Sequence, residues 1–254
     1  MIPYFVQSPL LRAIPGVYHA FVGIDPVRER ALRGQLREVF AVPPSRLGTL
    51  RQVHSAVALE MEETDGDLPG RRWREGDALW TAAPGTGVAV RTADCVPVLL
   101  AHPGLPVCAA IHVGWRGMAA GVIGETVLCI AARAGAGAIE GLAAAAGPSA
   151  RKCCYEVDEA VADRLRACPG GVRHLVKGRG PGKWNADLPS LAVESLLSAG
   201  LSRGRVETVG PCTICSPMFH SYRREKSLTG RQHSFIYRWD FPDIVRTLPG
   251  QDTR

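Results

Sequence analysis

Three side chains that could ligate a transition metal lie far apart in this sequence: His54, Cys95 and His112. Two imidazoles and one thiolate suit zinc, and a catalytic zinc ion takes three protein ligands and keeps a fourth position for water or substrate. Structural zinc sites are instead closed by four ligands, usually in tight Cys-x2-4-Cys or His-x3-5-His pairs, and these three residues form no such pair. Their types and wide spacing favour an open, reactive zinc site.

Each of the three residues also has an ordinary structural interpretation. His54 could be a hydrogen-bonded surface histidine, Cys95 a small buried hydrophobic residue and His112 a satisfied core residue, since buried, unreactive cysteine is common. Spacing alone leaves both interpretations open.

A shared site requires rigid elements beside each ligand. Apolar runs at 88–90, 96–100 and 107–113 predict buried strands. Cys95 therefore falls in a break between two extended segments, and His112 lies at the end of the third strand.

Helices are expected after these strands. The apolar positions from Val122 to Ile130 follow a helical period that ends near Gly135. Two more helices are predicted at 157–168 and at 187–199, the second with Asp187 as its N-cap. Strands and helices alternate irregularly, which predicts an α/β (α+β) fold of mixed sheets with helices outside. We expect a single domain over 1–254, with its core at about 16–237 and a frayed tail at 251–254.

Seven motifs occur in the order expected of the laccase-domain family, also called YfiH-like, and this chain resembles that family over nearly its whole length. The motifs are Gln52-Val53-His54, Gly76-Asp77-Ala78-Leu79-Trp80-Thr81, Thr92-Ala93-Asp94-Cys95-Val96-Pro97, His112-Val113-Gly114-Trp115-Arg116-Gly117, Gly147-Pro148, Cys153-Cys154-Tyr155-Glu156-Val157, and Phe219-His220-Ser221-Tyr222-Arg223-Arg224 through Thr229-Gly230-Arg231-Gln232.

The resemblance implies a layered sandwich fold in which His54, Cys95 and His112 match the family's zinc-binding and catalytic residues. The family was described first as multicopper polyphenol oxidases and later as purine nucleoside phosphorylases. The resemblance therefore implies phosphate-dependent cleavage of adenosine, inosine and methylthioadenosine, with adenosine deamination as a further activity. In this chain, the segment from His19 to Pro26 lacks an arginine that the family usually carries there, which puts one anion contact in doubt.

The two implied reactions need different groups. For deamination, zinc could lower the pKa of a bound water to about 7, giving a hydroxide that attacks the purine. Asp94 could then carry a proton, or could serve only as a structural hydrogen-bond acceptor. Phosphorolysis needs positive charge to hold phosphate, and Arg116, Arg223 and Arg224 are the candidate phosphate ligands. Ordinary surface ion pairing is the alternative for each.

Composition limits the class of protein. The chain has 254 residues, 46% of them hydrophobic, with neither a signal peptide nor an apolar stretch long enough for a membrane span, so we expect a cytoplasmic protein with no membrane partner. The net charge of +6 comes from arginine, because only four residues are lysines. The arginine clusters are too short for a nucleic-acid interface. The expected partners are purine nucleosides and phosphate, and the sequence leaves the oligomeric state open.

Eight cysteines occur, including the adjacent Cys153 and Cys154 and the Cys-x-x-Cys pair formed by Cys212 and Cys215. The chain length and the missing export signal favour reduced thiols. No second Cys-x-x-Cys pair follows, so structural packing is favoured over a redox or zinc role for Cys212 and Cys215.

Three other functions are the alternatives. Laccase chemistry is rejected, because its copper clusters require more imidazoles than the seven histidines present and no His-x-His pair occurs. A cysteine hydrolase or amidase would use Cys95 as nucleophile and His112 as base. The resemblance links such an activity to the editing of peptidoglycan precursors. A zinc-bearing binding protein would keep the ligands without turnover. Metal dependence distinguishes the hydrolase from the zinc enzyme.

Overall fold

Two large mixed sheets lie face to face in a computed structural model that describes residues 4–24, 42–43, 46–62, 73–226 and 230–239. The first sheet has five strands in the order β1 (Phe5–Val6), β2 (Val17–Val22), β14 (Gln232–Arg238), β6 (Thr86–Thr92) and β3 (Leu47–Gly48). The second has six strands in the order β13 (Val206–Thr208), β9 (Ala143–Ala146), β7 (Val96–Ala101), β8 (Cys108–Val113), β5 (Ala78–Thr81) and β4 (Ala58–Glu60). Most pairings are antiparallel, while β3 with β6, β4 with β5 and β9 with β13 are parallel.

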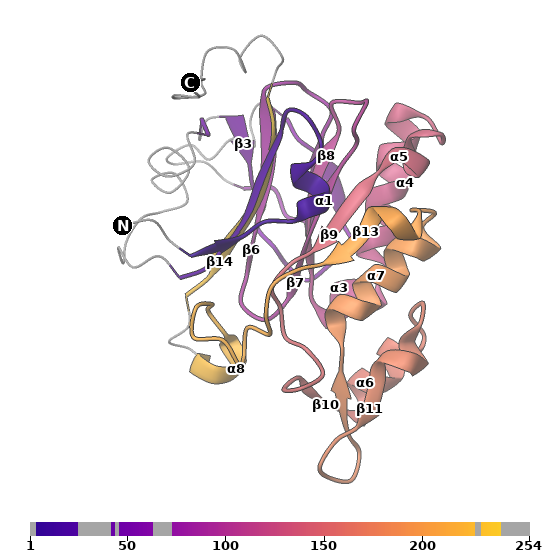
Figure 1. Cartoon of the computed structure of the whole chain (residues 1–254). Coiled ribbons are helices and arrows are strands. Elements are labelled where there is room, and N and C mark those ends of the chain that lie inside the picture. Colours follow the sequence, from indigo (N-terminus) through magenta and orange to yellow (C-terminus); the bar gives the residue numbers. More distant parts are fainter. Residues whose placement is uncertain (1–3, 25–41, 44–45, 63–72, 227–229, 240–254) are drawn as a thin grey trace.

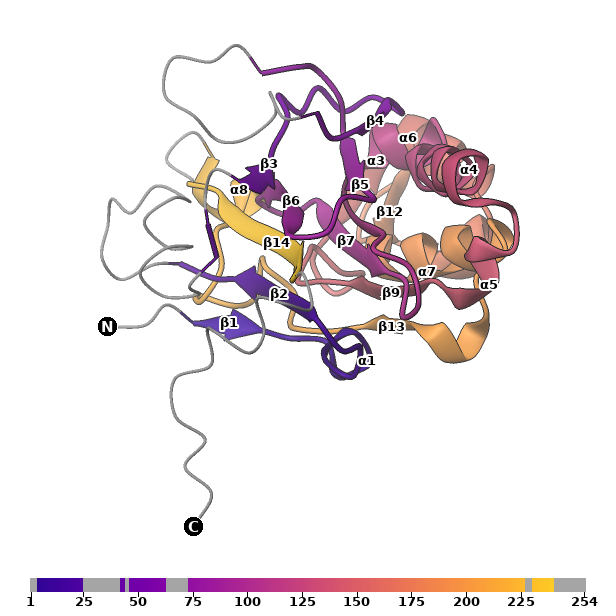
Figure 2. The ribbon, with the colours of Figure 1, turned by 90° about the horizontal axis from the view of Figure 1, so that it is seen from above.

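Helices cover the outer face of the six-stranded sheet, so that Figure 2 shows three layers: sheet, sheet and helices. The helices in the described residues are α1 (Pro9–Arg12), α3 (Trp115–Ala119), α4 (Val122–Ala134), α5 (Ala138–Gly141), α6 (Glu159–Arg166), α7 (Leu188–Ser198) and α8 (Tyr222–Glu225), with the 3-10 turns η3 (Gly171–His174) and η4 (Arg203–Arg205), and not all of them belong to the outer layer. Helices α4 and α7 lie in the outer layer, whereas α8 lies apart from them at the lower end of the first sheet (Figure 1).

The middle layer explains the continuous apolar run of β7, in which every residue is buried. Successive side chains of a strand point to opposite faces. Val98 and Leu100 pack in the cluster beneath the helices, while Leu99 and Ala101 pack in the cluster between the two sheets. A strand covered on both faces needs no polar alternation.

A small sheet of β10 (Glu156–Asp158), β12 (Lys183–Ala186) and β11 (Leu175–Lys177) extends below the layers, next to α6. Figure 1 places this small sheet on the same side of the molecule as α8. The two large sheets, α8 and the small sheet therefore meet near one end of the sandwich.

The predicted α/β (α+β) class, with mixed sheets and helices outside, is confirmed. The strands predicted at 96–100 and 107–113 correspond to β7 and β8, and the segment with Cys95 is the break before β7. The helix predicted to end near Gly135 is α4, whose C-cap is that glycine, and Asp187 is at the N-cap position of α7.

One helix, α6, differs from its prediction at both ends. The helix expected from Val157 begins at Glu159, because residues Glu156–Asp158 pair with β12 as strand β10. The Asp158 side chain then caps α6 by accepting from the Val161 N–H. The helix also ends earlier, at Arg166.

The frayed tail expected at 251–254 lies outside the described residues. The segment that lacks an arginine lies partly outside them, at positions 25–26. Within the described part of the chain, no helix combines the length and apolar character needed to cross a bilayer.

Candidate functional site

His54, Cys95 and His112 come together although 58 residues separate the first from the last. Their candidate ligand atoms all lie within 4.8 Å of one another, with 3.9 Å between the His54 Nε2 and the Cys95 Sγ. The two imidazole rings stand nearly perpendicular, at 78°, with centroids 4.8 Å apart. The structure thus brings together all three candidate ligands that the sequence singled out.

A buried aspartate, Asp77, fixes both histidines. It lies just before β5 and its side chain is fully buried. Its carboxylate accepts from the His112 Nδ1 at 2.8 Å and from the backbone N–H groups of His54 and Ser55 at 2.9 and 2.5 Å. His54 has a φ of 61°, which a non-glycine residue adopts only when its surroundings hold it there. Asp77 therefore shapes the turn that presents His54.

The bond from His112 to Asp77 also decides which ring nitrogen of His112 is available. With Nδ1 donating to the carboxylate, Nε2 is left to face Cys95. This carboxylate–histidine pairing is common behind metal-binding histidines, where it orients the ring and strengthens the ligand. The role of Asp77 was not predicted from the sequence, although it stands in the Gly76-Asp77-Ala78 motif.

The charged forms of Cys95, His112 and Asp77 stabilise one another. Burial opposes ionisation of Cys95, but hydrogen bonds from His112 and His54 outweigh it and lower the pKa of the thiol to about 6. Burial disfavours the His112 imidazolium, yet Asp77 and Cys95 raise its pKa to about 9. Burial likewise opposes the Asp77 carboxylate, while His112 and Ser55 lower its pKa to about 2. Without a metal, the site at neutral pH therefore holds a Cys95 thiolate beside a His112 imidazolium, and a bound metal would take the thiolate and replace the proton on the His112 Nε2.

Gly114 leaves room for the ligands. A Cβ at this position would lie 2.9 Å from the His54 Cδ2 and 3.1 Å from the Cys95 Sγ, closer than side chains normally approach. Since Gly114 is also the N-cap of α3, the chain turns from β8 into a helix directly beside the three ligands.

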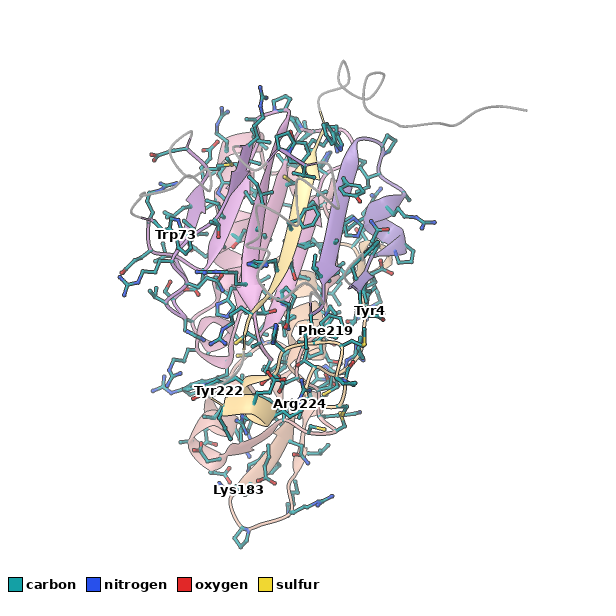
Figure 3. All side chains as sticks on the ribbon, turned by 90° about the vertical axis from the view of Figure 1, so that its left-hand side faces the viewer. Tyr4, Trp73, Lys183, Phe219, Tyr222 and Arg224 are labelled. Atoms are coloured by element: carbon teal, nitrogen blue, oxygen red, sulfur yellow. The ribbon has the colours of Figure 1, made fainter. Side chains whose placement is uncertain are left out.

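The three residues line a cavity of about 730 Å³, which is within the usual range for small-molecule sites. Its lining contains four arginines and three aromatic residues. The arginines are Arg91, Arg116, Arg223 and Arg231, and the aromatic residues are Trp115, Tyr155 and Tyr222. Figure 3 places Tyr222 on α8, between the first large sheet and the small sheet. Strand ends from both large sheets and the chain around α8 therefore contribute to one cavity.

Arg116 and Arg223 line this cavity, whereas Arg224 does not. The Arg116 guanidinium lies 4.4 Å from the centre of the Trp115 ring, and that of Arg223 lies 4.8 Å from the centre of the Tyr155 ring. The Arg224 guanidinium instead donates to backbone carbonyls, those of Thr213, Ile214, Ser216 and Phe219. Arg224 therefore stabilises the loop at 213–219 by hydrogen bonds to its backbone.

Two further arginines in the cavity, Arg91 and Arg231, were not identified from the sequence. Arg91 lies in β6 and stacks on Trp73, and its backbone pairs with the Gln52 side chain at 2.7 and 2.8 Å. Arg231 stands in the Thr229-Gly230-Arg231-Gln232 motif that supported the resemblance. Motif membership was an available signal for Arg231 but not for Arg91, and no spacing rule connects either position to the candidate ligands.

Asp94, next to Cys95, is a structural acceptor in this geometry. It has a φ of 84°, so the segment is a tight turn, in the break that the sequence predicts between two strands. Its carboxylate accepts from the Thr213 and Ser221 hydroxyls, at 2.7 and 3.1 Å, and from the Arg223 N–H at 2.7 Å. It thereby ties the Cys95 turn to the start of α8.

The donor set of the site distinguishes zinc from copper. All seven histidines lie in the described part of the chain, and only His54 and His112 belong to a group that could hold a metal. Two imidazoles, one thiolate and a cavity on the open side fit a zinc ion with an exchangeable fourth position. They do not fit a multicopper cluster, which needs many more imidazoles.

Comparison with known proteins gives a consistent family. The family described as multi-copper polyphenol oxidoreductase laccase matches residues 22–239. The chain is 32% identical to the purine nucleoside phosphorylase YlmD of Geobacillus stearothermophilus over 81% of this chain and 77% of that one. It is 36% identical to the purine nucleoside phosphorylase YfiH of Escherichia coli K12 over 76% of this chain and 74% of that one.

Solved structures agree with these matches. The crystal structure of YlmD from Geobacillus stearothermophilus superposes with a TM-score of 0.81 at 26% identity, covering 94% of this chain and 100% of that one. That of the Neisseria meningitidis protein NMB0706 superposes with a TM-score of 0.76 at 27% identity, covering 94% and 100%.

Proposed function

Because this chain belongs to the family described as multi-copper polyphenol oxidoreductase laccase, and its curated relatives are named purine nucleoside phosphorylases, we propose that it is a purine nucleoside phosphorylase. The proposed substrates are adenosine, inosine and methylthioadenosine, cleaved with phosphate, and adenosine deamination is a proposed second activity. The observation that carries the proposal is that His54, Cys95 and His112 line the same cavity as four arginines.

The proposed cofactor is one zinc ion held by the His54 Nε2, the Cys95 Sγ and the His112 Nε2. When bound, zinc would supply Lewis-acid polarisation of a substrate oxygen or an activated water. Asp77 holds the His112 ring by accepting its Nδ1–H, so that the ligand nitrogen stays in place and in the right tautomer.

The chain's own residues would bind phosphate on the arginine side of the cavity. Arg116 and Arg223 are the proposed phosphate ligands, since a planar guanidinium can donate two parallel hydrogen bonds to one phosphate. The Arg223 Nη1 already donates to the Glu156 carbonyl at 2.7 Å, which fixes the direction of the guanidinium. Arg91 and Arg231 line the same cavity and add positive potential there.

Aromatic residues would hold the nucleoside. Trp115, Tyr155 and Tyr222 offer ring faces to a purine, and such stacking is sequence-tolerant among bases. Burial, reinforced by the Cys95 charge, raises the pKa of Tyr155 to about 12, so its hydroxyl stays protonated at neutral pH. That hydroxyl can donate a hydrogen bond to the substrate.

The proposal is tested by incubating purified protein with adenosine, with and without phosphate, and identifying products by chromatography. Ribose 1-phosphate and adenine, formed only with phosphate, are expected. Inosine formed without phosphate would support the deaminase activity alone. If neither product forms with zinc-loaded protein, the proposed function is wrong. The His54→Ala/His112→Ala double variant serves as the inactive control.

A cysteine hydrolase is the second candidate, because the Cys95 thiol lies between two imidazoles, as a catalytic thiolate would. Alkylation separates the two functions. A thiolate bound to zinc should react slowly with iodoacetamide and faster after chelation, whereas a free nucleophile should react fast in both states. Mass spectrometry of the peptide that contains Cys95 reads the difference, and rapid labelling unaffected by zinc would favour the hydrolase.

A further inference from the structure

A second group of possible metal ligands lies outside the cavity, and it consists of four cysteines. Cys153 and Cys154 come from the loop between β9 and β10, and Cys212 and Cys215 come from the loop after β13. Their four sulfur atoms all lie within 4.8 Å of one another. The Cys215 Sγ is 3.1 Å from that of Cys154 and 3.6 Å from that of Cys153.

These separations are close to those of a tetrahedral thiolate site. Four sulfurs at the usual zinc–sulfur distance of about 2.3 Å form a tetrahedron with edges of about 3.8 Å. The Cys153–Cys215 separation of 3.6 Å lies just below this edge, the Cys154–Cys215 separation of 3.1 Å is shorter, and no pair of the four sulfurs is more than 4.8 Å apart. We propose that Cys153, Cys154, Cys212 and Cys215 bind a second zinc ion, which is structural and not catalytic.

The exposure of the four residues distinguishes this group from ordinary packing. Cys212 is buried, Cys154 is half-buried, and Cys153 and Cys215 are exposed. Two exposed thiols contribute little to a hydrophobic core, so the packing predicted from the sequence accounts for Cys212 alone. Exposure on one side gives a metal ion a path of entry to the site.

The two loops that carry the four cysteines are joined even without a metal, because the Thr213 N–H donates to the Ser149 carbonyl at 3.1 Å.

With four protein ligands the ion would have no open position, so its role would be to hold the two loops together. Tyr155, which lines the cavity, directly follows Cys154. Thr213, which lies between Cys212 and Cys215, donates to Asp94 beside Cys95. The second zinc would therefore stiffen one wall of the cavity without touching substrate.

The test counts zinc where the first site has been removed. In the His54→Ala/Cys95→Ala/His112→Ala background, elemental analysis of protein purified without chelator should find about one zinc per chain. Adding Cys212→Ser and Cys215→Ser should remove it. The matched control adds Cys129→Ser and Cys168→Ser, two half-buried thiols outside both groups, and should keep it.

Two measurements on the unmutated protein cover the case in which the cysteine variants do not fold. Cobalt exchanged for zinc should show the strong sulfur-to-cobalt charge-transfer absorption of a four-thiolate ion, in addition to that of a one-thiolate ion. Peptide mapping of protein purified with reductant should find the four thiols unlinked. A Cys154–Cys215 disulfide, iron in place of zinc, or absence of metal from the triple-variant background would overturn the inference.

Metal content and spectra, not turnover, decide this test. A protein that holds zinc on the four cysteines but does not cleave adenosine with phosphate would leave this inference standing and refute the proposed function. A phosphorylase without the second zinc would do the reverse.

Discussion

The two candidate metal sites differ in both ligands and surroundings. His54, Cys95 and His112 are presented at strand ends and adjoining turns, are supported by the buried Asp77, and open into a cavity lined with arginines. The four-cysteine group has only sulfur ligands, is carried by two loops, and contributes none of its ligands to that cavity. An ion with three ligands and a cavity has room for chemistry, while one with four thiolates has none. Within one chain, the ligand count and the neighbouring space would thus separate a reactive ion from a structural one.

The largest expected effect comes from removing a ligand of the open site. His54→Ala, Cys95→Ala and His112→Ala should each lose the zinc of that site and lower kcat/KM for phosphorolysis by about 10³-fold, because the metal contributes several kcal/mol to the transition state. Elemental analysis and kinetics check this, with Cys129→Ser as the control. Zinc on the four cysteines should remain. Full activity of Cys95→Ala would refute the open zinc site.

The next effect tests the support behind the ligands. Asp77→Asn keeps the size of the side chain but removes the charge that orients His112, so zinc affinity at the open site should fall about 10- to 100-fold. Competition with a chelator of known affinity measures the change. Asp94→Asn is the matched control, because Asp94 is a buried carboxylate that bonds loop residues and not a ligand. Asp94→Asn should lower the melting temperature but leave the zinc affinity of the open site nearly unchanged. If Asp94→Asn and Asp77→Asn lose the same amount of zinc affinity, the role assigned to Asp77 is contradicted.

A smaller effect separates the two neighbouring arginines. Arg223→Ala, like Arg116→Ala, should raise the KM for phosphate about 10-fold with little change in the KM for nucleoside, as expected for loss of one charged hydrogen-bond partner. Arg224→Ala should lower the melting temperature, because Arg224 holds the loop that carries Cys212 and Cys215. Unchanged phosphate dependence in both cavity variants would place the anion site elsewhere.

The smallest expected effect concerns neither metal site. Burial, with a contribution from Arg12, lowers the pKa of His19 to about 4, below its ordinary value of 6.5. The unfolded chain therefore takes up a proton that the folded chain refuses, so stability should fall as pH drops from 6.5 towards 4, by about 1 kcal/mol at pH 5.5. Above pH 6.5 this loss disappears.

The variant His19→Gln tests this origin of acid sensitivity. The His19 Nε2 accepts from the Ser8 N–H at 2.8 Å, and a glutamine oxygen can accept in its place without titrating. Denaturant unfolding at pH 7.5 and 5.5 should show a smaller acid loss in the variant than in the unmutated protein. An equal loss would assign the acid sensitivity to other groups, such as the metal ligands.

Regular elements with a strong local signal were predicted well. The apolar run of β7 and the helical period of α4 need only neighbouring residues to be recognised, and glycines mark the end of α4 and the turn after α7. The start of α6 was missed by two residues, since Glu156–Asp158 belongs to a strand only through pairing with β12, nearly 30 residues further along. A local pattern carries no information about such a partner.

The sequence by itself determined the types of the candidate ligands, the family resemblance and the interruption between two strands at Cys95. Only the tertiary structure decided that Asp77 fixes His112, that Arg91 and Arg231 share the cavity with Arg116 and Arg223, and that Arg224 serves a loop. It also brings Cys153 and Cys154 into contact with a Cys-x-x-Cys pair about 60 residues away, a contact that no motif spacing predicts. The physical reason is the same in each case. Residue types and local hydrophobic periods can be read from neighbouring positions in the sequence. The spatial neighbours of a side chain instead depend on strand order and loop closure, which arise only when the sheets pack.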